Sequence, residues 1–159
     1  GIIPGAATYG ITSTDAAAAA SYSLFRAAAI RFMLGNAAGS PADVRLLLRP
    51  EAWGDLDGTI FDAGSGITEW DRLSRAMPNT VTTSNALDAP AGTPVASTAV
   101  MTTTAGGLPP AFMAIWGGID LIRDVFTDAQ SGGLRLTGIV TADVTVPRGS
   151  QVEIITGIQ

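Results

Sequence analysis

The side chains of this sequence that could do chemistry are mainly carboxylates. Asp55, Asp57 and Gly58 have the spacing that begins a calcium-binding loop. Such a loop needs a glycine at its sixth position and a bidentate glutamate at its twelfth. This sequence has Ile60 and Gly66 at those positions. The segment is therefore predicted to be a solvated turn rather than a metal site.

Two pairs of acids invite comparison with a glycosidase, which uses two carboxylates about 5 to 10 Å apart. The pairs are Asp62 with Glu69 and Asp120 with Asp124. Sequence does not place either pair in a cleft, and fourteen acids spread along a chain are mostly surface charge. A carbohydrate-active enzyme or a sugar-binding module, built on Asp and Trp side chains, remains the alternative from another functional class.

Three residue types that serve most enzymes are missing, since the sequence has no Cys, no His and no Lys. Without His there is no common general base and no catalytic triad, so Ser65 between Gly64 and Gly66 is not a nucleophile elbow. Without Lys there is no Schiff-base chemistry. We predict that the protein is not an enzyme, has no catalytic residue, binds no cofactor and holds no metal.

Composition predicts a globular chain with a weakly polar surface, and such a surface is usually covered by another molecule. The 159 residues are 47% hydrophobic but only 14% charged, and the net charge is −5. All nine basic residues are scattered arginines, so no basic stripe predicts phosphate binding. Arg26 and Arg31 interrupt the most apolar segment, so no stretch reaches the roughly 18 residues of a membrane span. We expect neither a membrane nor a small-molecule substrate as a partner.

Periodicity and turn residues predict helices and strands in a definite order. An alanine-rich helix over Ala16–Leu34 is capped by Thr14 or Asp15 and ends at Gly35. A buried strand, Val44–Leu48, follows, and Pro50 then starts a short helix. The remaining predicted elements are a helix over Ile67–Ala76 and strands over Thr80–Ser84, Val95–Thr104, Ala111–Asp124, Leu134–Val146 and Val152–Thr156.

These elements predict an α+β fold with a mixed, largely antiparallel sheet flanked by two or three helices. Large apolar side chains on their inner faces form the expected core. The predicted core residues are Leu24, Phe25, Phe32, Leu46, Leu48, Trp53, Leu56, Phe112, Ile115 and Leu136.

Four segments, in this order, carry a family resemblance. They are the run from Arg49 to Leu56 (RPEAWGDL), Val81–Ser84 (VTTS), Trp116–Leu121 (WGGIDL) and Asp124–Thr127 (DVFT). Together they resemble the major capsid proteins of tailed bacteriophages, those of the Hong Kong 97 type. The family usually has asparagine where this sequence has Arg49.

The resemblance covers only the C-terminal half of a capsid protomer. It implies that residues 1–131 are an axial-domain-like region and that residues 132–159 are the last strands of the peripheral-domain sheet, the two forming one compact unit. In the family, an N-terminal arm, an extended hairpin and a long spine helix come before this part.

The resemblance also implies a function. The chain would be a structural subunit of an icosahedral bacteriophage or prophage capsid, assembled in the bacterial host cytoplasm from pentamers and hexamers. Its partners would be other copies of itself, with packaged DNA held only by enclosure and no specific nucleic-acid site. Encapsulin nanocompartment shells are similar to these capsids and remain an alternative.

By its place in the order of elements, the loop Asp57–Gly66 resembles the axial loop at the centre of each pentamer or hexamer. Ile60 and Phe61 are apolar residues with no obvious partner in a polar loop, so we expect Phe61 to be unusually exposed. The candidate inter-subunit residues are Asp57, Gly58, Thr59, Ile60, Phe61, Asp62, Gly64, Ser65 and Gly66.

Overall fold

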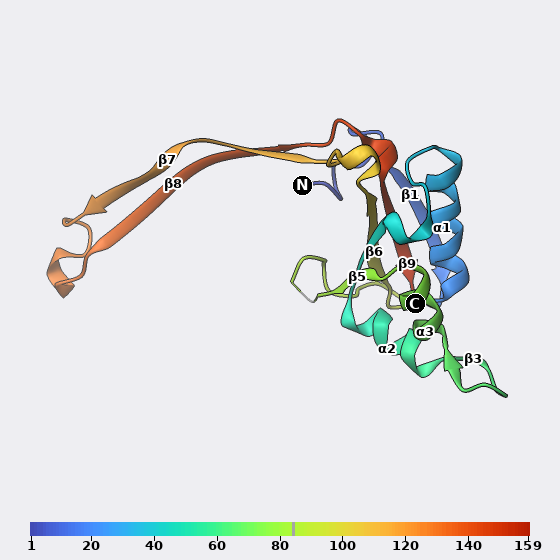
Figure 1. Ribbon diagram of the computed structural model, residues 1–159. Helices are drawn as coiled ribbons and strands as arrows, with labels where there is room; N and C mark the ends of the chain where they lie inside the picture. The colour runs from blue at the N-terminus through green and yellow to red at the C-terminus, as the bar shows by residue number, and fades with distance from the viewer. Residues whose placement is uncertain (84) are drawn as a thin grey trace. The chain divides into compact units, whose positions relative to one another are not determined.

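The computed structural model describes residues 1–83 and 85–159 (Figure 1). The chain divides into two compact units: unit 1 is Gly1–Pro110 with Val146–Gln159, and unit 2 is Ala111–Thr145. This division differs from the expected single unit and from the predicted boundary after residue 131. The reason is that the last strand of the chain pairs with strands of unit 1. The assignment of axial and peripheral domains stays a prediction.

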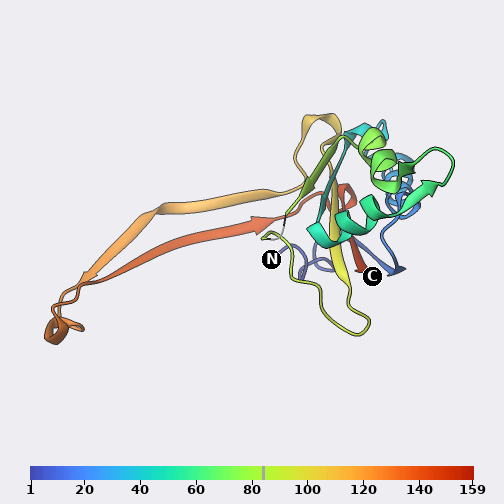
Figure 2. The ribbon, with the colours of Figure 1, turned by 90° about the horizontal axis from the view of Figure 1, so that it is seen from below.

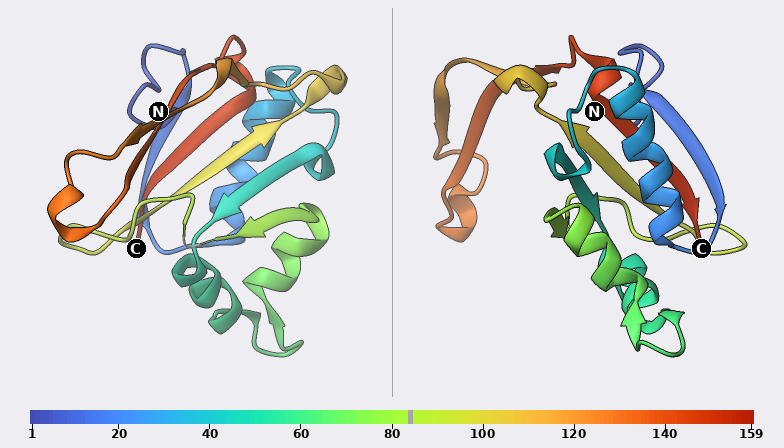
Figure 3. Two further views of the ribbon diagram at one scale, coloured as in Figure 1. Left: turned by 90° about the vertical axis from the view of Figure 1, so that its left-hand side faces the viewer. Right: turned by 45° about the vertical axis from the view of Figure 1, so that its right-hand side comes forward.

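Unit 1 is built on a five-stranded mixed sheet (Figure 3). The strand order is β1 (Thr12–Ala18), β9 (Val152–Ile158), β6 (Ser97–Thr103), β2 (Val44–Leu48) and β5 (Asn79–Thr82). The outer pairs β1/β9 and β2/β5 are parallel, while β6 runs antiparallel to both of its neighbours. With three α-helices in the described residues, the predicted α+β class is confirmed.

Helix α1 (Tyr22–Leu34) lies against one face of this sheet (Figure 3). Phe25, Ala28, Ala29 and Phe32 are its buried residues, and their spacing defines one face of a helix. Alanine allows the helix backbone to come close to the sheet, and Phe25 and Phe32 belong to the same core cluster as the buried strand residues.

The predicted start of this helix is wrong. Residues Thr12–Ala18 form β1, and the cap is Ser21, whose hydroxyl accepts a hydrogen bond from the Leu24 amide at 3.4 Å. Thr14 donates instead to the Glu153 carboxylate at 2.9 Å. A parallel pairing with β9, about 140 residues away, overrides the helix propensity of the alanines.

The elements on either side of Arg49 follow the sequence closely. β2 has the predicted bounds, and α2 (Pro50–Gly58) begins at the proline. Helix α3 (Glu69–Ala76) starts later than predicted, because Thr68 caps it reciprocally with the Asp71 carboxylate.

Helix α3 packs against both α1 and α2. Between α2 and α3 the rings of Trp53 and Trp70 meet edge to face, with 6.3 Å between centroids. Short 3₁₀ turns cover Pro41–Asp43, Ala105–Gly107, Ala129–Ser131 and Gly149–Gln151. No helix in the described ranges is long and apolar enough to cross a membrane.

The core prediction holds for most of the residues named in unit 1 and fails in unit 2. Five of the predicted residues are buried and Leu24 is partly buried; the five are Phe25, Phe32, Leu46, Leu48 and Leu56. Trp53 was wrongly assigned to the core: its ring meets Trp70 of α3, but the side chain is 38% exposed. Phe112, Ile115 and Leu136 are about half exposed and belong to unit 2.

Unit 2 is a long antiparallel hairpin of β7 (Phe112–Asp124) and β8 (Arg135–Thr145), which run side by side in Figures 1 and 2. The pairing is irregular between Trp116 and Asp120, where Gly117 has a φ of +74°. Glycine is favoured at this irregularity because positive φ strains other residues.

Candidate assembly site

The predicted axial loop is a small hairpin followed directly by a helix. Asp57 and Gly58 end α2, so the carboxylates once compared with a calcium loop lie on a helix. After Thr59, strands β3 (Ile60–Asp62) and β4 (Ile67–Thr68) pair antiparallel, and Ala63–Gly66 form the turn between them.

Local hydrogen bonds close the tip of this hairpin. The Asp62 carbonyl accepts the amides of Ser65 at 3.1 Å and Gly66 at 3.2 Å. The Asp62 carboxylate accepts the Gly64 amide at 3.2 Å. Gly66 has a φ of +65°, which explains a glycine at the end of the turn. Because these bonds are internal, the tip keeps its shape without help from the sheet.

The base of the hairpin is tied to two helices. The Glu69 amide, at the start of α3, donates to the Thr59 carbonyl at 2.9 Å. The Glu69 carboxylate accepts the Tyr22 amide, at the start of α1, at 2.8 Å. A negative charge at a helix N-terminus is stabilising, so Glu69 joins α1 to α3 next to the hairpin.

Phe61 is 52% exposed, as predicted, and Ile60 is 58% exposed. Phe61 nevertheless has a partner outside the loop. The Arg72 guanidinium carbon lies 3.6 Å from the centroid of the Phe61 ring and 4.5 Å from that of Tyr22. These are cation–π contacts that hold the hairpin strand against α3 and α1.

A groove of about 530 Å³ runs beside the hairpin. It is lined by Tyr22, Phe61, Asp62, Ser65, Ile67, Arg72, Arg75 and Ala76. Sequence reasoning missed Tyr22, Arg72 and Arg75, because these residues come from α1 and α3 and no local motif connects them with the loop.

The acids considered for sugar chemistry are used in other ways. Glu69 accepts the Tyr22 amide at the start of α1, and Asp62 holds the hairpin tip. Asp120 and Asp124 are four residues apart on β7, which separates their backbones by about 13 Å. Hydrogen bonds from the Thr127 hydroxyl and from the Phe126 and Thr127 amides lower the Asp124 pKa, opposite to what a general acid needs. In the described ranges, no group of three or more acidic residues could hold a metal ion.

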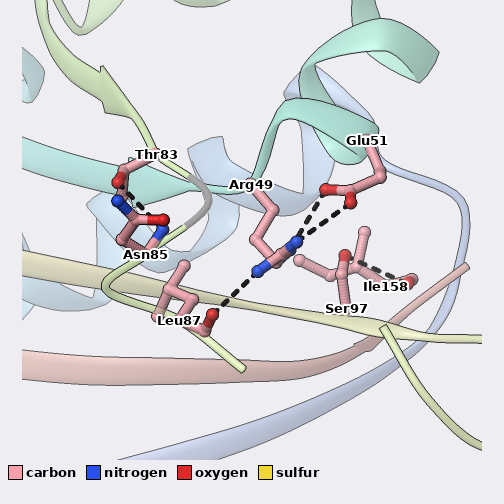
Figure 4. Close-up of polar contacts among 7 residues, drawn as sticks. All are labelled: Arg49, Glu51, Thr83, Asn85, Leu87, Ser97 and Ile158. Atoms are coloured by element: carbon pink, nitrogen blue, oxygen red, sulfur yellow. Dashed lines mark hydrogen bonds and ion pairs between the residues drawn. The ribbon is translucent and has the colours of Figure 1, made fainter. Parts of the chain in front are cut away.

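Arg49, the departure from the capsid pattern, is a buried structural residue (Figure 4). Its guanidinium donates to the Leu87 carbonyl at 2.8 Å and to both Glu51 carboxylate oxygens at 3.0 and 3.1 Å. Asparagine is too short to reach two such partners at once. The hydrogen bonds from Arg49 lower the pKa of Glu51, and the same contact raises the pKa of Arg49.

Comparisons with known proteins give matches by structure but not by sequence. No family model matches the chain, and a search of curated proteins finds no significant match. Solved structures do match. A virus-like particle protein from Pyrococcus furiosus has a TM-score of 0.54 and 11% identity, over 96% of this chain and 59% of that chain.

Two phage structures match as well. The capsid of Myoviridae phage XM1 gives a TM-score of 0.58 and 18% identity over 94% of this chain. A Mycobacterium phage Che8 chain gives 0.58 and 13% over 92%. This chain spans about half of those chains, 52% and 53%.

The fold of this chain is therefore similar to that of a virus-like particle protein and of a phage capsid protein. More narrowly, the chain has part of the Hong Kong 97-type capsid fold, and the resemblance predicted from the sequence is confirmed at the level of the fold.

Proposed function

We propose that this chain is the C-terminal half of a structural subunit that assembles with copies of itself into a closed icosahedral shell. The observation that carries this proposal is the likeness in fold to three shell or phage structures over more than nine-tenths of the chain. A shell subunit acts through contact surfaces, so the protein needs no catalytic residue, cofactor or metal.

The apolar hairpin of unit 2 supports an assembly role. On β8 the residues Leu136, Val140 and Val144 are separated by even numbers of positions, so they share one face. The register places Met113 and Ile115 of β7 on the same face. An exposed two-stranded hairpin with such a face is marginally stable in water, so the face needs cover in the complete particle.

For the kind of shell, we propose a bacteriophage or prophage capsid that encloses the genome and is assembled in the host cytoplasm. Two of the three structures above come from phages. The scattered arginines favour DNA held by enclosure over a dedicated nucleic-acid site. An encapsulin-type compartment is the second candidate, favoured by the match to the Pyrococcus virus-like particle. Nuclease-protected DNA in particles isolated from the host would support the capsid, and a packaged protein cargo would support the compartment.

Electron microscopy of the full-length protein expressed by itself tests the proposal as a whole. We expect closed shells with five-fold vertices. A protein that stays monomeric under conditions where it is folded and concentrated would contradict the assembly function.

We further propose that Ile60, Phe61 and Asp62 contact neighbouring subunits around the symmetry axes. The exposure of two apolar side chains on a closed hairpin supports this role. Changing Ile60 and Phe61 to Ser should lower particle yield about tenfold or more, because each lost apolar contact weakens association by roughly 1 kcal/mol.

The matched control is Leu34→Ser, which removes an apolar side chain that is 79% exposed elsewhere in unit 1. We expect it to assemble normally. If the Ile60/Phe61 variant folds and forms particles with normal yield and symmetry, the hairpin is an ordinary surface turn.

A further inference from the structure

Three arginines gather on one flank of unit 1. Arg72 and Arg75 line the groove beside the β3/β4 hairpin together with Tyr22 and Ala76. Tyr22 and Ala76 also line the neighbouring hollow, which contains Arg26 of α1. The two hollows thus form one surface, which we call the arginine flank and define by Arg26, Arg72 and Arg75.

The arginine flank lacks internal charge partners. Among the residues that the structure describes, none of its three arginines forms an ion pair. The acids of the neighbouring elements accept hydrogen bonds from backbone amides instead: Glu69 from Tyr22, Asp71 from Thr68 and Asp62 from Gly64. Arginine presents a planar fork of donors that suits carboxylates, so the flank fits an acidic partner.

An acidic surface lies on α2. The nine-residue helix carries Glu51, Asp55 and Asp57 and no basic residue. Glu51 is paired with Arg49, whereas Asp55 and Asp57 are exposed and form no ion pair with any described residue. We call Asp55 and Asp57 the acidic end of α2.

The acidic end is unfavourable for α2 by itself. Asp55 and Asp57 lie in its last turn, where the helix dipole disfavours negative charge. Neither carboxylate makes a hydrogen bond to a described residue that would offset this effect. No contact among the described residues of the subunit therefore stabilises these two carboxylates. A contact with another subunit would stabilise them.

The two surfaces lie on different sides of α3. Helix α3 packs against α1, which carries part of the arginine flank, and against α2, which carries the acidic end. Arg72 reaches Tyr22 on the first side, and Trp70 meets Trp53 on the second. Two complementary surfaces on different faces of one subunit are what a head-to-tail ring contact requires.

We propose that the arginine flank of one copy binds the acidic end of α2 of the next copy around a ring. This inference rests on the proposed shell function and specifies which surfaces meet. Each copy uses both surfaces, so the contact closes a ring of five or six with the same pairing throughout. Complementary charge also selects the correct orientation. Two arginine flanks, or two acidic ends, would repel each other if they met.

Charge reversal in the full-length protein tests this contact. One variant carries Arg26→Glu and Arg75→Glu, a second carries Asp55→Arg and Asp57→Arg, and a third combines all four changes. Arg72 is kept because it supports Phe61 and Tyr22. Arg45→Glu, an exposed arginine on β2 outside the flank, is the matched control.

Particle yield is measured by sedimentation and electron microscopy, with circular dichroism and melting to verify folding. We expect each two-residue variant to lose about tenfold or more in yield through like-charge repulsion, and the combined variant to recover most of it. The control should match the wild type.

The outcomes separate the two proposals. If the wild type forms no particles, the shell function itself is wrong, and this contact with it. If the wild type and both two-residue variants assemble equally, only the contact is wrong. If the folded combined variant fails like its parents, the two surfaces do not pair with each other.

Discussion

Unit 1 and unit 2 use apolar residues in opposite ways. In unit 1, α1 covers one face of a five-stranded sheet, so Phe25 and Leu48 are fully buried. Unit 2 has two strands and no covering layer within its own residues, so Trp116 and Ile139 of the hairpin remain about half exposed. Apolar content alone therefore does not make a core, because a core needs a second layer.

The largest expected difference between the units comes from truncating phenylalanine. Phe25→Ala empties a fully buried site and should lower the free energy of unfolding by about 3 to 5 kcal/mol. Phe112→Ala, in unit 2, removes a ring that is 49% exposed and should change it by less than about 1 kcal/mol. Denaturant unfolding of the unassembled protein, followed by fluorescence, measures both. Equal effects would mean that the hairpin is packed as tightly as the sheet.

The same contrast explains what sequence could and could not predict. The bounds of β2 were predictable because Val44–Leu48 is a short apolar run that ends at Arg49 and Pro50. The start of α1 was not, because β1 exists only through its pairing with β9 at the other end of the chain. The alternation in β8 predicted a strand correctly, but alternation does not say what covers the apolar face, so Leu136 was wrongly assigned to the core.

The candidate site shows a similar limit. The polar, glycine-rich composition predicted a turn, and the exposure of Phe61 within it was also predicted. The Arg72 contact with Phe61 depends on how α3 packs beside the hairpin, which is tertiary information. Which acids and arginines lack an internal ion pair is likewise tertiary information, because it depends on how the helices and strands pack.

The next contrast concerns ion pairs. In unit 1 the Glu153 carboxylate is 2% exposed and accepts hydrogen bonds from Arg31 and Thr14. Arg31→Met should destabilise unit 1 by about 2 to 3 kcal/mol, because it leaves a buried carboxylate without its cation. In unit 2, Arg135 and Asp128 are 3.8 Å apart and exposed, so Arg135→Met should cost less than about 0.5 kcal/mol.

A double variant tests the cause of the Arg31 effect. Adding Glu153→Met to Arg31→Met removes the unpaired charge, so part of the lost stability should return. Thermal melts of the three proteins measure this. Additive losses would show that Arg31 acts through packing of its side-chain stem rather than through charge.

Glycine positions give a smaller contrast. A Cβ at Gly149, in unit 1, would clash with the Tyr9 carbonyl oxygen, which is backbone and cannot turn away. Gly149→Ala should destabilise by about 1 to 3 kcal/mol through overpacking. A Cβ at Gly138, in β8, would meet only Ile119 at an ordinary 3.7 Å, so Gly138→Ala should be close to neutral. Similar melting temperatures for both variants would contradict the close approach of residues 9 and 149.

The smallest contrast is in pH dependence. The hydrogen bonds from Arg49 lower the pKa of Glu51 in unit 1, and those from Thr127 and Phe126 lower the pKa of Asp124 in unit 2. A carboxyl whose pKa is lower in the folded state stabilises that state above its unfolded pKa, about 4 for these groups, and loses this contribution as pH falls through the folded value. Both contributions are therefore present at neutral pH and disappear in acid.

The two units should nevertheless respond differently. Glu51 orients Arg49, which also holds Leu87, so Glu51→Gln should make the acid-side loss of unit 1 stability shallower. Asp124 closes a local turn at the end of β7, so its protonation should speed amide exchange at Phe126 and Thr127 while the melting of unit 1 stays unchanged. Hydrogen exchange between pH 3 and 6, corrected for intrinsic rates, distinguishes the two. A coupled response in both units would show that the hairpin and the sheet unfold as one body.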